Sequence, residues 1–150
     1  MKLDRQWIES HIPHQGSMCL LEEVVSWDLQ RVACRAGSHR APDNPLRAHG
    51  RLNSVCAIEY AAQAIAVHGA LLQSRPGGGS GFGMLTSARR VEFAVARLDD
   101  LAQDLLVTAV RLHSDAVSAL YAFSLQQDER LLAQGRLSVL LGMSATPGPS

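Results

Sequence analysis

The stretch from Arg51 to Leu72 constrains the fold most strongly, because it is long, mostly apolar and free of proline. Its alanines and leucines are strong helix formers, and Asn53 or Ser54 can cap its start. A helix of this length makes about six turns and spans about 30 Å. Apolar side chains lie around nearly the whole circumference, which predicts a helix buried on most of its faces.

Two polar side chains, Glu59 and Gln63, interrupt this helix one turn apart. Burying a carboxylate without a partner is costly, so Glu59 must either find a partner or face a cavity. A structural carboxylate paired with an arginine is the alternative for Glu59, and a satisfied core amide is the alternative for Gln63. We favour a functional role for Glu59.

The length and charge of the chain narrow the classes of protein further. A chain of 150 residues suits one domain, which we place at residues 1–142, followed by a disordered Pro/Gly/Ser tail at 143–150. Lys and Arg total 14, as do Asp and Glu, and no basic stripe with aromatic residues suggests a nucleic-acid partner. The first residues lack the apolar run of a signal peptide, and polar residues interrupt the apolar helix. We therefore expect a cytoplasmic protein that does not bind a membrane.

The order of elements predicts an α+β fold. A short helix at 3–12, a strand at 31–37 and an irregular loop at 38–50 precede the long helix. A Gly-rich connector at 75–81 follows it. Four strand-like segments then complete the domain, at 82–94, 104–113, 116–126 and 131–141. An antiparallel sheet can wrap one side of an apolar helix, and a second subunit can cover the other, so we also expect a dimer.

Two motifs resemble those of hotdog-fold 3-hydroxyacyl-carrier-protein dehydratases. Residues 12–24, with the sequence Ile-Pro-His-Gln-Gly-Ser-Met-Cys-Leu-Leu-Glu-Glu-Val, are similar to the Leu-Pro-His opening of that family. Residues 58–64, Ile-Glu-Tyr-Ala-Ala-Gln-Ala, are similar to its Ile-Glu-x-Met-Ala-Gln helix motif. The resemblance implies a hotdog fold, in which an antiparallel sheet wraps one long central helix. The closest subgroup resembles small dehydratase-like proteins of aryl-polyene, polyketide and fatty-acyl pathways.

The resemblance also implies a reaction, the removal of water from a 3-hydroxyacyl thioester to give an enoyl thioester. The substrate would be carried on the phosphopantetheine of an acyl carrier protein or on CoA, with no other cofactor. A histidine and a carboxyl group suit the two proton transfers. By resemblance Glu59 is the catalytic acid and Gln63 a neighbouring helper. Helix-start amides suit an enolate-like oxygen, which makes Asn53, Ser54 and Val55 the expected substrate-binding positions.

The catalytic histidine departs from the family pattern. The well-known dehydratases carry it in a Gly-His-Phe-Pro loop, and Pro45 occupies the corresponding position here. We predict His14 as its replacement because the surrounding motif matches. His49, just before the helix, is the second candidate, and His39 lies further back in the same loop.

Three functions remain open at this point. The first is a homodimeric or heterodimeric dehydratase, and the second is a catalytically impaired hotdog subunit that binds acyl chains or stabilises an active partner. The third is an acyl thioesterase that uses the same carboxylate to activate water, because one fold hosts several activities. No set of His, Cys, Asp and Glu has zinc-site spacing, so we predict no metal.

Overall fold

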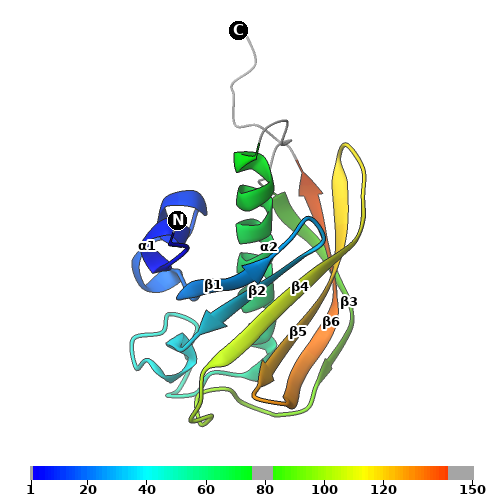
Figure 1. Ribbon diagram of the computed structural model, residues 1–150. Helices are drawn as coiled ribbons and strands as arrows, with labels where there is room; N and C mark the ends of the chain where they lie inside the picture. The colour runs from blue at the N-terminus through cyan, green and yellow to red at the C-terminus, as the bar shows by residue number, and fades with distance from the viewer. Residues whose placement is uncertain (1, 76–82, 142–150) are drawn as a thin grey trace, which may run out of the picture.

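The computed structural model describes residues 2–75 and 83–141 and shows the expected α+β architecture (Figure 1). Short 3-10 turns lie at Gly16–Met18, Ser38–Arg40 and Ser54–Cys56. The helices and strands are α1 (Arg5–His11), β1 (Glu23–Trp27), β2 (Arg31–Ala36), α2 (Ala57–Ser74), β3 (Gly83–Phe93), β4 (Leu105–Ser114), β5 (Ser118–Gln127) and β6 (Arg130–Leu141). The predicted tail at 143–150 and nearly all of the predicted connector lie outside the described residues.

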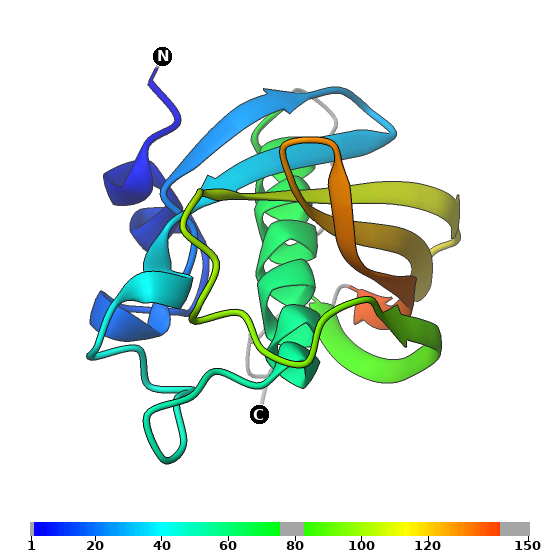
Figure 2. The same ribbon diagram turned by 90° about the horizontal axis from the view of Figure 1, so that it is seen from below.

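The six strands form one antiparallel sheet in the order β1-β2-β4-β5-β6-β3. The sheet curls around α2, which contacts β2, β3, β4 and β5 (Figures 1 and 2). In Figure 2, α1 and the 38–50 loop lie beside α2 on the side that the sheet leaves open. Alternate residues of β4, such as Leu105, Val107 and Ala109, point into the core, as its period of two predicts.

The central helix begins later than the sequence predicts. The side chain of Asn53 accepts a hydrogen bond from the Val55 amide at 2.9 Å, and this contact caps a 3-10 turn instead of the α-helix itself. Regular helix therefore starts at Ala57. The span Ser54–Ser74 has the length and composition of a membrane-crossing helix, but 61% of its apolar 18-residue window is buried inside the fold, which marks it as a core helix.

Two buried histidines tie loops to the core. His39 is fully buried, and its Nε2 lies 3.1 Å from the carbonyl oxygen of Leu101. His68 is fully buried in α2, where its Nδ1 lies 2.6 Å from the Tyr121 hydroxyl and its Nε2 lies 2.8 Å from the Asp28 carbonyl oxygen. Burial lowers the pKa of both imidazoles below the ordinary value of 6.5.

These two lowered pKa values predict a loss of stability in mild acid. Below pH 6.5 the unfolded chain binds protons that folded His39 and His68 do not take up. Above that pH both states hold these histidines neutral, so we expect no destabilisation from them there. The free energy of unfolding should then fall as the pH decreases toward about 5, where carboxylates begin to contribute. Urea unfolding at closely spaced pH values measures this slope. His39→Gln and His68→Gln should each flatten it, and an unchanged slope in both variants would contradict the assignment.

Candidate active site

Glu59 and His14 meet at the start of the central helix. Glu59 lies in the first turn of α2, and His14 follows Pro13 just after α1. The Nε2 atom of His14 lies 3.2 Å from Oε1 of Glu59. A hydrogen bond across this contact uses one proton, carried either by Nε2 or by the carboxyl group. The side chains of His14 and Glu59 remain 25% and 35% exposed, which leaves both accessible to a ligand.

Gln63 holds this pair in place from one turn further along α2. Its side-chain oxygen accepts a hydrogen bond from the Leu20 amide at 2.9 Å. Its Nε2 donates to the Met18 carbonyl oxygen at 2.8 Å and to Oε1 of Glu59 at 3.1 Å. Gln63 is fully buried, and its bond to the Leu20 amide forms away from water, whereas its bonds to Met18 and Glu59 are partly buried. Within the described residues, the contacts of the Glu59 carboxylate all use Oε1, which leaves Oε2 for a substrate.

The turn that carries His14 is also anchored to α1. Arg5 donates a hydrogen bond to the Gly16 carbonyl oxygen at 2.8 Å, and Gln15 donates to the Glu9 carbonyl oxygen at 2.6 Å. Gly16 adopts a φ of 59°, a left-handed conformation that glycine takes without strain. His14 is therefore presented to Glu59 from a fixed turn.

A cavity of about 180 Å³ runs along α2 from this pair. On the helix side Ala62, Ala66 and Gly69 leave space because their side chains are small or absent, and Leu85 and Val139 line the sheet side. The walls are thus mainly apolar and the polar pair lies at one end. Such a cavity suits an aliphatic chain whose reactive end lies beside Glu59.

The structure separates the second histidine candidate from this site. His49 is exposed, has a φ of 53°, and lines a different cavity together with Arg51, Asn53 and Arg97. His14 is the predicted candidate that contacts Glu59. Sequence spacing alone did not decide between the two, because His14 reaches Glu59 through tertiary packing.

The expected amide donors at the helix start form other hydrogen bonds. The Ser54 amide donates to the Ala96 carbonyl oxygen at 3.1 Å, and the Val55 amide donates to the side chain of Asn53 at 2.9 Å. The Cys56 amide donates to the Asn53 carbonyl oxygen at 3.0 Å. The prediction that Ser54 and Val55 offer free amides to an enolate oxygen therefore needs correction, because the Ala96 carbonyl and the Asn53 side chain already accept from them. The substrate-binding role of Asn53 stays a prediction.

Sequence reasoning assigned no role to Tyr121, which lines the cavity from β5. Burial raises its pKa to about 12, so its hydroxyl is neutral at physiological pH. The alternation along β5 places Tyr121 on the buried face with Phe123 and Leu125, and this signal was available in the sequence. In the described residues, no cluster of three or more His, Cys, Asp and Glu side chains could hold a metal ion.

Comparison with known proteins identifies the family. The ApeP-like family, described as ApeP dehydratase, matches residues 6–145. The chain belongs to this dehydratase family. No curated protein matches the sequence significantly.

Solved structures show the same fold. The dehydratase heterocomplex ApeI:P from Xenorhabdus doucetiae aligns with a TM-score of 0.80 and 25% identity, and the alignment covers 91% of each chain. Zebra fish thioesterase superfamily member 2 aligns with a TM-score of 0.65 and 18% identity over 92% of this chain and 95% of that one. A mutant of the thioesterase PA1618 from Pseudomonas aeruginosa aligns with a TM-score of 0.57 and 12% identity over 79% of each chain. The predicted hotdog fold and dehydratase resemblance are thus confirmed.

Replacing Gln63 should destabilise the chain and loosen its polar pair. Gln63→Leu leaves the buried Leu20 amide without its acceptor, which costs about 1–3 kcal/mol, and also removes the partly buried bond to the Met18 carbonyl oxygen. We expect a clearly lower Tm by calorimetry. Gln134→Leu is the matched control, since Gln134 is exposed and its loss should change stability by less than about 0.5 kcal/mol. Equal Tm values for the two variants would contradict the role of Gln63.

Proposed function

We propose that this chain is a hotdog dehydratase subunit that removes water from a 3-hydroxyacyl thioester. The contact between His14 and Glu59 at one end of an apolar cavity carries the proposal, in a chain of the ApeP-like dehydratase family. The acyl chain would extend along α2, with its thioester and its 3-hydroxyl group beside the polar pair. The substrate would be carried by an acyl carrier protein or by CoA.

The pair can supply both proton transfers of the reaction. When His14 is an imidazolium ion, it can pass its Nε2 proton to Glu59 across their contact. This transfer leaves a neutral imidazole as the base and a carboxylic acid as the proton donor. His14 then takes the proton from C2, and Glu59 protonates the hydroxyl that leaves C3 as water. The C2–C3 double bond forms, and the pair returns to its starting protonation.

A thioesterase remains the second candidate, because hotdog thioesterases share the fold. In that reading the Glu59 carboxylate would activate a water molecule that attacks the thioester carbonyl. The two activities leave different products, an enoyl thioester or a free acid. A catalytically impaired subunit would leave the substrate unchanged when it is incubated alone. Dehydration would then depend on the active sites of the partner subunit.

The test is incubation with 3-hydroxyacyl-carrier protein, alone and together with a related hotdog subunit, followed by intact mass. We expect loss of one water from the acyl-carrier protein. Glu59→Gln and His14→Asn should each slow this loss by about 10²- to 10⁴-fold, because each removes one proton-transfer group. His49→Asn is the matched control and should change the rate only a few-fold, since His49 lines a separate cavity. Undiminished dehydration by Glu59→Gln would overturn the mechanism, and release of free acid would favour the thioesterase.

We further propose that a related hotdog subunit pairs with the β3 edge of the sheet. β3 ends the strand order and is hydrogen-bonded to β6 on one side. It exposes large apolar side chains, including Met84, Leu85 and Phe93. An open edge with apolar side chains is a template for pairing with another chain. The similarity to a dehydratase heterocomplex supports a hotdog partner, either a second copy or a related chain.

A charge on this edge should prevent the association. Met84 is 66% exposed, so Met84→Glu should leave the fold intact while it places a carboxylate in the interface. We expect a shift to monomer in size-exclusion chromatography with light scattering. Val117→Glu is the matched control, because Val117 is 62% exposed in the turn between β4 and β5. An unchanged oligomer in Met84→Glu, or an equal shift in Val117→Glu, would place the interface elsewhere.

A further inference from the structure

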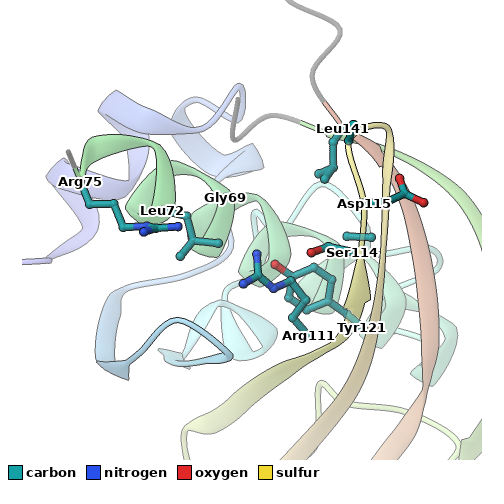
Figure 3. Close-up of a pocket in the computed structure, with 10 residues that line it drawn as sticks. Gly69, Leu72, Arg75, Arg111, Ser114, Asp115, Tyr121 and Leu141 are labelled. Atoms are coloured by element: carbon teal, nitrogen blue, oxygen red, sulfur yellow. The ribbon is translucent and has the colours of Figure 1, made fainter. Parts of the chain in front are cut away.

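A second cavity continues the first one along the central helix. It measures about 220 Å³ and shares Gly69, Tyr121 and Leu141 with the cavity that begins at Glu59. Figure 3 shows Tyr121 and Arg111 reaching from the sheet toward the part of α2 that carries Gly69 and Leu72. Gly69 lies ten residues beyond Glu59, which corresponds to about 15 Å along the helix axis. A ligand that follows the helix from the polar pair therefore meets Tyr121 at the junction of the two cavities.

The hydrogen bonds of His68 determine what Tyr121 can offer to such a ligand. The Nε2 atom of His68 faces the Asp28 carbonyl oxygen at 2.8 Å, and a carbonyl oxygen only accepts, so Nε2 carries a proton. His68 is fully buried, which disfavours the doubly protonated, charged imidazole. Its Nδ1 is therefore an acceptor, and the Tyr121 hydroxyl donates to it at 2.6 Å. The Tyr121 oxygen keeps a lone pair but has no proton left to donate.

Arg111 supplies the complementary donor on the sheet side of the second cavity. One of its guanidinium nitrogens donates to the Leu29 carbonyl oxygen at 2.9 Å, and Arg111 also lines the cavity beside Tyr121 (Figure 3). The guanidinium carries five N–H donors, more than this bond uses. Tyr121 at the junction thus offers an acceptor that cannot donate, and Arg111 in the second cavity offers a donor that cannot accept. A hydroxyl group, which does both, satisfies each of them.

The alternatives fit this pair of groups less well. A plain alkyl end forms no hydrogen bond. It would displace water from Tyr121 and Arg111 without replacing the hydrogen bonds that the water makes to them. A carboxylate would suit Arg111 and Arg75, but it would place its charge against the acceptor oxygen of Tyr121 and in the same cavity as the Asp115 carboxylate. A hydroxyl group avoids both costs.

We propose that Tyr121, oriented by His68, binds a hydroxyl group on the distal part of the acyl chain and makes the site selective for such chains. This inference rests on the proposed function, because it places an acyl thioester along α2. Tyr121 is then a specificity-determining residue, and His68 is the positioning residue that fixes the direction of its hydroxyl.

The experiment compares acyl-CoA thioesters of increasing length, each made with a methyl, a hydroxyl or a carboxylate at the distal end. Binding is measured by calorimetry, and dehydration of the matching 3-hydroxyacyl series by intact mass. We expect the hydroxyl series to bind best at the lengths that reach Tyr121. Tyr121→Phe should lower the preference for hydroxyl over methyl by about two- to tenfold, the effect of one neutral hydrogen bond. It should leave the binding of the methyl series nearly unchanged.

Tyr60→Phe is the matched control for this substitution. Tyr60 is also fully buried, and its hydroxyl bonds to Ser38 at 2.7 Å and to Asn44 at 3.3 Å, so the variant loses a comparable buried group outside the cavities. It should keep the preference of the original chain. Equal binding of methyl and hydroxyl chains, a preference for carboxylate, or a preference that survives in Tyr121→Phe would each overturn the proposal. Dehydration of both series without preference would overturn this proposal alone, whereas selective binding without dehydration would overturn the proposed function and leave the hydroxyl site standing.

Discussion

The amide side chain of Gln63 joins the N-terminal segment to the central helix, and the candidate site depends on this connection. His14 and Glu59 belong to segments far apart in the sequence, and neither segment places the other by local structure. Gln63 bridges them by bonding the Met18 carbonyl and the Leu20 amide while it also donates to Glu59. A buried amide that satisfies three partners contributes more than an apolar side chain of the same size, because the buried Leu20 amide would otherwise have no acceptor. The same residue therefore stabilises the fold and orients the Glu59 carboxylate.

A helix that is apolar on nearly all sides must be packed against other elements on nearly all sides. In this fold the packing is tighter on some faces of α2 than on others. The curled sheet packs against one side of α2, and α1 with the 38–50 loop lies beside the other (Figure 2). Where Ala62, Ala66 and Gly69 face the sheet, short side chains leave the cover incomplete, and the cavity forms there. The space for a ligand thus comes from the packing of the core helix itself. The cavity is small and has apolar walls because it lies between a core helix and the inner face of the sheet.

The sequence predicts the fold better than it predicts the site, for a physical reason. Helix and strand periods are local, so the apolar helix and the alternation in β4 are readable from neighbouring residues. The choice between His14 and His49 is not local, because it depends on how the segment after α1 docks on α2. The hydrogen-bond partners of the helix-start amides could not be predicted from the sequence either. Asn53 caps a 3-10 turn, and the Ala96 carbonyl belongs to the segment that follows β3. Tyr121 was readable as a buried residue of β5, but its pairing with His68 required the three-dimensional arrangement.

The anchoring of His14 bears on the choice between a dehydratase and a thioesterase. A carboxylate that activates water for thioester hydrolysis needs room for that water and a donor for the thioester oxygen, and it can act without an adjacent imidazole. Dehydration needs two groups that exchange a proton, one to take it from C2 and one to return it at C3. The chain holds His14 against Glu59 through its turn, with Arg5 and Gln15 bonded around it and Gln63 bonded just beyond it. An imidazole held beside a carboxylate is the arrangement that these two proton transfers require, which is consistent with the dehydratase family to which the chain belongs.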